Sequence, residues 1–304
     1  MPLFQNNARY HLLALLATVI WGTTFVSTKI LLSHGLTPAE IMFLRFLLAY
    51  IAIWSISPAR LFAENLRDEA KLIAAGMCGG SLYFFAENSA LEITQASNVA
   101  IIISITPLLT AILSHLFVRG ERFGSRLLAG GLLSLIGIAC VVLNGRFVLH
   151  ISPLGDLLTL FAGFMWACYN IILTKLYARY DTVFITRKVF FYGLVTLLPV
   201  FLIQPIEFHF RQLLDPTIAL NLLFLGLLAS FGCFLIWNIA VRHIGTIRAN
   251  SYLYLSPLIT FTTAAIFLQE EITPVALAGT ALILSGVWIS EQGLPKPKRH
   301  PFHK

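Results

Sequence analysis

Charged residues are scarce in this chain, and their scarcity argues against a water-soluble globular protein. Asp, Glu, Lys and Arg make up 12% of its 304 residues, about half the share of roughly 25% that is usual in soluble domains. Hydrophobic residues supply 58% of the chain, and the mean hydropathy is +0.82. These values indicate an integral membrane protein whose short connections leave no room for a soluble catalytic domain.

Several chemical signatures are also missing. The four cysteines have no CxxC spacing and fall within apolar segments, so we expect small buried side chains rather than disulfides or a metal site. No GxxxxGK[ST] loop occurs, which excludes a primary ATP-driven pump unless a partner supplies the ATPase. HExxH, GxSxG and clustered His/Asp sets are absent as well. We therefore expect no cofactor, no metal and no enzyme activity.

Long apolar runs are what the sequence does contain. A hydrocarbon core about 30 Å thick requires roughly 20 apolar residues per helix, so the chain can hold ten spans. We predict them at 11–33, 38–56, 71–91, 96–118, 125–144, 153–176, 183–204, 216–240, 247–268 and 273–291. The first run continues past Trp21, so we interpret it as a span and not as a cleavable signal peptide.

Basic residues predict the orientation of these spans. With the N-terminus in the cytoplasm, seventeen of the 21 Lys and Arg residues fall on the cytoplasmic side, and the opposite loops hold little more than Arg146 and Arg211. This is the bias of the positive-inside rule. It places both termini in the cytoplasm, including a basic tail at 293–304, and it explains the net charge of +7 without nucleic-acid binding. The charged stretch 58–71 reads as a solvated or interfacial linker.

The second half of the chain repeats the first at an offset of 150 residues. Asn88, Ala90, Pro107, Leu108, Thr110, Phe117 and Glu121 recur as Asn238, Ala240, Pro257, Leu258, Thr260, Phe267 and Glu271. Each copy holds five predicted spans, and an odd number places the copies in opposite orientations in a bilayer. Inverted repeats around a central cavity are typical of secondary transporters. We predict an all-α integral membrane fold of two inverted five-helix repeats, at 10–146 and 152–292.

Polar and charged side chains inside the spans are candidates for a binding site, because they are costly in lipid unless they face a cavity. Glu87 is the acidic residue most clearly within a span, and Tyr83 lies on the same helix face. We interpret Glu87 as the candidate for proton coupling or for pairing with a substrate ammonium group. The alternative is that the helix ends earlier and Glu87 reaches water.

One aromatic residue with one or two small polar groups recurs in several spans, a combination that suits a moderately polar small molecule. The candidate substrate-binding residues are Trp21, Thr24, Tyr83, Glu87, Asn88, Trp166, Tyr169, Asn170, Trp237, Asn238, Asn250 and Tyr254. Arg45 lies well inside a span and could neutralise either a helix C-terminus or a substrate carboxylate; the sequence favours neither role. His115 is interpreted as a packing residue rather than a proton relay.

Two kinds of small or rigid residue bear on the architecture. Pro107 and Pro257 lie in mid-span at matching points of both repeats. They predict kinked helices that could act as gates, since a membrane tolerates such kinks where neighbours or a cavity satisfy the freed carbonyl. Glycines such as Gly130, Gly137 and Gly286 are expected to let helices pack closely.

Several of these stretches carry a family resemblance. Residues 105–111 read ITPLLTA and precede Gly120-Glu121-Arg122, and residues 255–260 read LSPLIT and precede Glu270-Glu271. With Ile20-Trp21-Gly22 and Arg45-Phe46, they resemble the drug/metabolite transporter superfamily, EamA type, over about residues 10–292. The second copy departs at Glu270, where the first has Gly120, which affects only a turn.

The resemblance implies a ten-helix bundle that moves small metabolites, including amino acids, across bacterial inner membranes. It supplies no strict binding-residue motif, so the candidates rest on helix position and repeat symmetry. We expect a secondary transporter that exports an amino acid or related amphipathic compound by alternating access. A passive channel is the first alternative. An intramembrane enzyme is a weaker one, because Asp156 and Asp181 lie at helix ends and lack the GxGD pattern.

Overall fold

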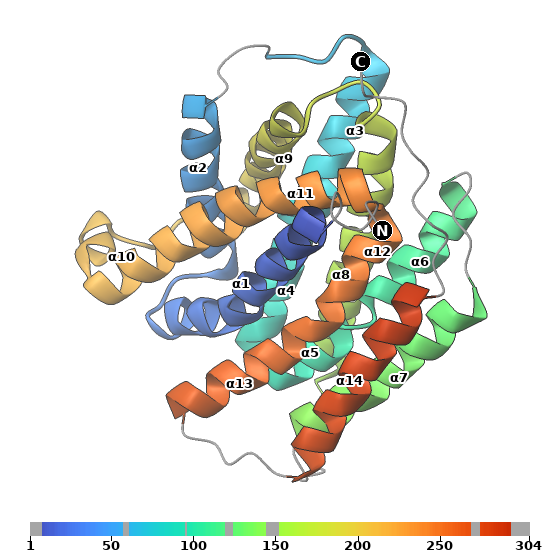
Figure 1. Ribbon diagram of the computed structural model, residues 1–304. Helices are drawn as coiled ribbons and strands as arrows, with labels where there is room; N and C mark the ends of the chain where they lie inside the picture. Colours follow the sequence, from blue (N-terminus) through green and yellow to red (C-terminus); the bar gives the residue numbers. More distant parts are fainter. Residues whose placement is uncertain are drawn as a thin grey trace.

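The protein is a bundle of helices in the computed structural model, which describes residues 8–56, 61–94, 96–118, 124–143, 152–268 and 274–292 (Figure 1). Within these ranges no strand is present. Five stretches are long and apolar enough to cross a membrane, namely Ala8–Ser33, Pro38–Ile56, Pro153–Leu176, Thr182–Leu202 and Pro216–Ile244. The predicted all-α membrane fold of two inverted five-helix repeats is confirmed. The predicted tail at 293–304 lies outside the described residues.

The helices follow the predicted spans, several of which are subdivided. The first repeat contains α1 (Ala8–Ser33), α2 (Pro38–Ile56), a third span of α3 (Leu66–Gly76), η1 (Met77–Ser81) and α4 (Leu82–Ile93), a fourth of α5 (Ala96–Ile103) and α6 (Thr106–Phe117), and α7 (Ser125–Leu143). In the second repeat, α8 (Pro153–Leu176) and α9 (Thr182–Leu197) come first. The turns η2 (Leu198–Leu202) and η3 (Phe210–Leu214) lead into a third span of α10 (Pro216–Leu223), η4 (Phe224–Gly232) and α11 (Cys233–Ile244). The fourth span combines α12 (Thr246–Ser251), η5 (Tyr252–Leu255) and α13 (Ser256–Leu268), and the fifth is α14 (Pro274–Gln292).

Departures from regular α-helix occur at equivalent points of both repeats. The third span of each repeat contains a π-helical stretch, η1 or η4. The fourth span of each is interrupted, before α6 and at the 3₁₀ turn η5. Pro107 and Pro257 are the second residues of α6 and α13, where a proline removes no helical hydrogen bond. The sequence predicted kinked helices at these prolines, and the structure has a break between two helical segments before each of them.

Glycines hold the last helices of the two repeats, α7 and α14, in close contact (Figure 1). A Cβ atom on Gly130 would lie 2.5 Å from the carbonyl oxygen of Gly286, and one on Gly137 would lie 2.6 Å from that of Gly279. As the residue number rises along α7 it falls along α14, so the helices are antiparallel. Gly279 and Gly286 are the repeat counterparts of Gly130 and Gly137, so the two contacts are related by exchange of the repeats.

Residues 61–67 of the charged stretch are mostly exposed, as expected of a solvated or interfacial linker, but Asp68 and Glu69 pack into the bundle. Residues 58–60 lie outside the described residues. The helix begins at Leu66, capped by Asn65, whose side chain accepts from the Asp68 amide at 2.9 Å. Asp68 is 1% exposed and binds the side chains of Lys71 at 2.7 Å and Arg179 at 2.9 Å. The hydrogen bond from Lys71, with those from Asn65 and Arg179, outweighs burial and holds the pKa of Asp68 below its usual value.

A second ion pair lies beside the first. Glu69 pairs with Lys188 of α9 and accepts a hydrogen bond from the hydroxyl of Tyr192. The ammonium of Lys188 also donates to the carbonyl oxygen of Leu61 at 3.0 Å. We call Asp68, Glu69, Lys71, Arg179 and Lys188 the inter-repeat ion-pair cluster. It joins the start of α3, in the first repeat, to α9 and the turn before it, in the second.

Candidate functional site

A cavity of about 60 Å³ lies where helices of both repeats meet at the helix breaks. Its lining includes five residues predicted from the sequence, which are Trp21, Thr24, Tyr83, Glu87 and Trp166. A water molecule needs roughly 10–15 Å³ on this scale, so the cavity has room for about four to six waters. Helices must part before it can admit a metabolite the size of an amino acid.

Two opposite charges line this cavity. Arg45 on α2 is 1% exposed and Glu87 on α4 is 6% exposed. Because α4 continues to Ile93, the alternative in which Glu87 reaches water beyond the helix end is wrong. Among the residues that the structure describes, no ion pair joins Arg45 to Glu87. The two charges therefore border one space without neutralising each other in direct contact.

Protein groups hold each charge in place. The hydroxyl of Tyr83, one turn before Glu87, donates to Glu87 Oε1 at 2.6 Å. Arg45 Nε donates to Ser230 Oγ at 2.9 Å, and the guanidinium carbon lies 4.2 Å from the centre of the Phe84 ring. Ser230 belongs to η4, so the π-helical stretch of the second repeat positions a cation of the first. Within the described residues no group of three or more His, Cys, Asp or Glu side chains could hold a metal.

Aromatic rings form the apolar part of the wall. Trp21 and Trp166 meet edge to face with their ring centres 5.3 Å apart, and Tyr83 lies 5.2 Å from Trp166. Trp21 Nε1 donates to the carbonyl oxygen of Ala229 at 2.8 Å, which fixes its ring against η4. Trp166 Nε1 is buried without a hydrogen-bond partner among the described residues. Such rings suit the apolar body of an amphipathic molecule.

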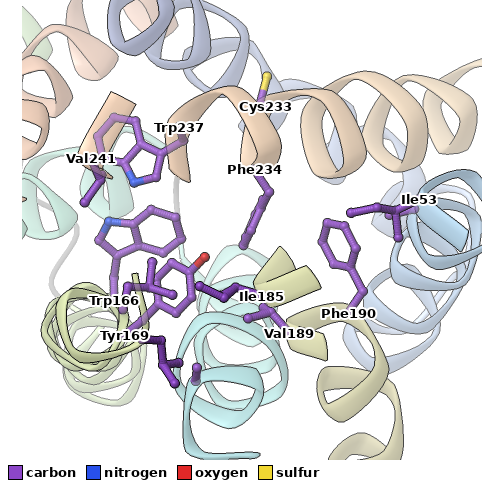
Figure 2. Close-up of a cluster of buried hydrophobic side chains, with 14 of the residues drawn as sticks. Ile53, Trp166, Tyr169, Ile185, Val189, Phe190, Cys233, Phe234, Trp237 and Val241 are labelled. Carbon is purple, nitrogen blue, oxygen red and sulfur yellow. The ribbon is translucent and has the colours of Figure 1, made fainter. Parts of the chain in front are cut away.

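Trp237 lies behind this wall rather than in the lining. Its ring centre is 5.1 Å from that of Trp21 and 6.1 Å from that of Trp166. Figure 2 shows Trp166 and Tyr169 of α8 facing Trp237 and Phe234 of α11 across the buried cluster. Trp237 therefore supports the cavity wall by packing against the rings of Trp21 and Trp166.

The repeated asparagines lie outside the lining and connect helices. Asn88 Nδ2 donates at 3.1 Å to the carbonyl oxygen of Pro38, the first residue of α2. Asn238 Nδ2 donates at 2.9 Å to Thr186 Oγ1, in the first turns of α9. Since α2 and α9 are repeat counterparts, both asparagines tie the third span of a repeat to the start of its second. This common contact accounts for their recurrence at an offset of 150.

The remaining candidates are bound within the protein and do not line the cavity. The Tyr169 hydroxyl donates to Asn238 Oδ1 at 2.9 Å, and Asn170 Nδ2 donates to the carbonyl oxygen of Trp166 at 2.9 Å. Asn250 Nδ2 donates to the carbonyl oxygen of Thr246 at 2.9 Å. Tyr254 is buried with Leu108 in a separate apolar cluster. His115, which the sequence analysis interpreted as a packing residue, is exposed on the last turn of α6.

Other lining residues were missed by the sequence prediction. Apart from Arg45, whose role the sequence left open, they are Phe25, Phe84, Ile103, Ser104, Thr106, Phe234, Leu253 and Ser256. Three of them, Ser104, Thr106 and Ser256, stand next to the helix breaks, so their position beside a mid-span proline was a usable signal. The apolar members had none, because phenylalanine, leucine and isoleucine occur throughout such spans.

Comparisons with known proteins agree with this architecture. The model of the EamA-like transporter family matches residues 8–143 and 153–291. A "probable amino-acid metabolite efflux pump" of Escherichia coli is 29% identical over 93% of this chain and 94% of its own length. A protein of the same description from Salmonella typhimurium is 30% identical over 92% of this chain and 94% of its own. One crystal structure matches 94% of this chain and 98% of its own, with a TM-score of 0.73 and 19% identity, which establishes the fold alone. The chain belongs to the EamA-like transporter family.

Proposed function

We propose that this transporter exports a small metabolite, an amino acid or related amphipathic compound, across the bacterial inner membrane by alternating access. The observation that carries the proposal is the cavity between the repeats, bordered by Arg45, by Glu87 and by aromatic rings. Names of two relatives, both described as amino-acid metabolite efflux pumps, support the same substrate class. Following the distribution of basic residues, we place both termini in the cytoplasm.

Each part of the lining has a role in this proposal. The Glu87 carboxylate, held by Tyr83, would accept a substrate ammonium group or a coupling proton. The rings of Trp21 and Trp166 would take the apolar body, and the hydroxyl of Thr24 would contribute a polar contact. We retain these five residues as the substrate-binding proposal.

Alternating access requires the helices around the cavity to part on one side at a time. The breaks before Pro107 and Pro257 support this motion, because α6 and α13 can tilt without carrying the first halves of their spans. The inter-repeat ion-pair cluster joins α3 to α9 and to the turn before α9 in the structure described here. Its pairs between α3 and the second repeat would separate when the transporter opens there.

Exchange across liposomes tests the proposal. Purified protein is reconstituted, the vesicles are preloaded with labelled phenylalanine, and efflux is measured with and without unlabelled phenylalanine outside. Carrier exchange predicts faster efflux in the presence of external phenylalanine. An efflux rate that external substrate leaves unchanged would favour a passive channel, and absence of flux across a panel of amino acids would reject the proposed substrate class.

The role of Glu87 is tested in the same vesicles. Replacing Glu87 by Gln removes the titratable group and the carboxylate, so we expect transport to fall about tenfold or more, equivalent to ~1.4 kcal/mol, and the residual rate to lose its dependence on pH. Replacement of Glu92 by Gln is the matched control, since Glu92 is exposed on the same helix. Wild-type transport that is already independent of pH would remove the proton-coupling role.

A further inference from the structure

Arg45 has more hydrogen-bond donors than the surrounding bundle satisfies. A guanidinium offers five N–H donors, and among the described residues it makes one hydrogen bond, from Nε to Ser230 Oγ. The side chain is 1% exposed, and Phe84 covers one face of the guanidinium. With Nε occupied, the Nη groups remain for whatever enters the cavity that Arg45 lines.

The nearest candidate counter-ion does not pair with this cation. Glu87 lines the same cavity, but its Oε1 accepts from Tyr83 at 2.6 Å, and within the described part of the chain no salt bridge connects it to Arg45. A buried guanidinium without an anion is costly in a membrane protein and marks a functional site by default. An anion that comes with the ligand would neutralise the guanidinium in direct contact.

Geometry narrows the kind of anion. The planar guanidinium fork matches a carboxylate in two parallel hydrogen bonds. Ser230 and Phe84 fix the plane of this fork from opposite repeats. Among the described residues that line the cavity, Arg45 is the only cation, so a polyanion would be left only partly neutralised. A single carboxylate on an amphipathic molecule fits these limits.

We infer that Arg45 binds the carboxylate of the transported compound and makes the site select carboxylate-bearing amphipaths over the corresponding amides. The inference rests on the proposed function and adds a specificity-determining residue to it. Across the cavity, Glu87 and Tyr83 would meet the ammonium group, so that a zwitterion satisfies both buried charges at once. Ser230 is then a positioning residue, since it acts through the Arg45 guanidinium.

The experiment compares phenylalanine with phenylalaninamide, which lacks the carboxylate. Binding to purified protein is followed by tryptophan fluorescence, because Trp21 and Trp166 line the cavity, and transport is followed in liposomes. Arg45→Met removes the charge, Arg45→Lys keeps the charge without the fork, and Ser230→Ala releases the fork from its support. The ratio of the two dissociation constants is read within each variant, so it does not depend on how much of that variant folds.

We expect wild-type protein to prefer the acid by about tenfold or more. The ratio should fall to near one in Arg45→Met through loss of phenylalanine binding, and to intermediate values in Arg45→Lys and Ser230→Ala. A tenfold preference that survives in Arg45→Met, a wild type without preference, or a wild type that binds neither compound would overturn the inference. Arg45-dependent binding without any transport would reject the proposed function and leave the inference standing. Transport together with an unchanged ratio in Arg45→Met would overturn the inference and leave the proposed function standing.

Discussion

Replacing Glu69 by Gln is expected to lower the free energy of unfolding by about 3 kcal/mol, because it leaves a buried ammonium without its carboxylate. Lys188 is 4% exposed and Glu69 14% exposed in their pair. Removing one partner of a buried pair costs far more than removing both. The measurement is thermal unfolding of the purified protein in detergent, with wild type and variant at the same detergent concentration.

Two further variants make this result specific. Asp68→Asn also removes an anion, but its partners Lys71 and Arg179 are 38% and 59% exposed, so water can solvate them and we expect a smaller loss. The double variant Glu69→Gln/Lys188→Met should regain much of the lost stability. Wild-type stability in Glu69→Gln, or a double variant less stable than either single one, would contradict a buried pair that joins the repeats.

Replacing Gly286 by Ala is the second change for which we expect a large loss of stability. The added Cβ would lie 2.5 Å from the carbonyl oxygen of Gly130 and 2.7 Å from the amide nitrogen of Ser134. Because these are backbone atoms, α7 and α14 must move apart. Overpacking of this kind costs about 1–3 kcal/mol, and at roughly 2–4 °C per kcal/mol the melting temperature should fall by about 5 °C.

Gly232→Ala is the matched control for this crossing. Its Cβ would meet only the carbonyl oxygen of Leu227, at 3.5 Å, so we expect a change of about 1 °C or less, or a small gain from the better helix propensity of alanine. Equal melting temperatures for Gly286→Ala and Gly232→Ala would show that the close contact between α7 and α14 does not limit the stability of the fold.

Repeat symmetry made the fold predictable from the sequence. An offset of 150 residues relates the prolines of the two helix breaks and the asparagines that connect spans, and an offset of 149 relates the glycines of α7 and α14. The repeat did not distinguish residues that connect helices from residues that line the cavity, since either kind can recur in both copies. Asn88 and Asn238 recur because each ties the third span of its repeat to the start of the second span. Glu87, by contrast, lines the cavity and has Trp237 at the equivalent position of the second repeat.

Contacts between residues distant along the chain could not be predicted from the sequence. Ser230 supports Arg45 from 185 positions away, and Lys188 pairs with Glu69 across two spans of separate repeats. No local periodicity encodes either contact. The burial of Asp68 and Glu69 was missed for the same reason, because acidic residues that would be solvated on an isolated helix find cations on α9 and on the turn that precedes it.

Alkylation of a single introduced cysteine tests the central claim, that the cavity between the repeats is the substrate site. Thr24→Cys lines the cavity and Ser33→Cys lies exposed at the end of the same helix; each is made after Cys78, Cys140, Cys168 and Cys233 are replaced by Ala. We predict that saturating phenylalanine slows alkylation at position 24 and leaves position 33 unaffected. Equal rates at position 24 with and without phenylalanine, in protein that still transports it, would contradict the account.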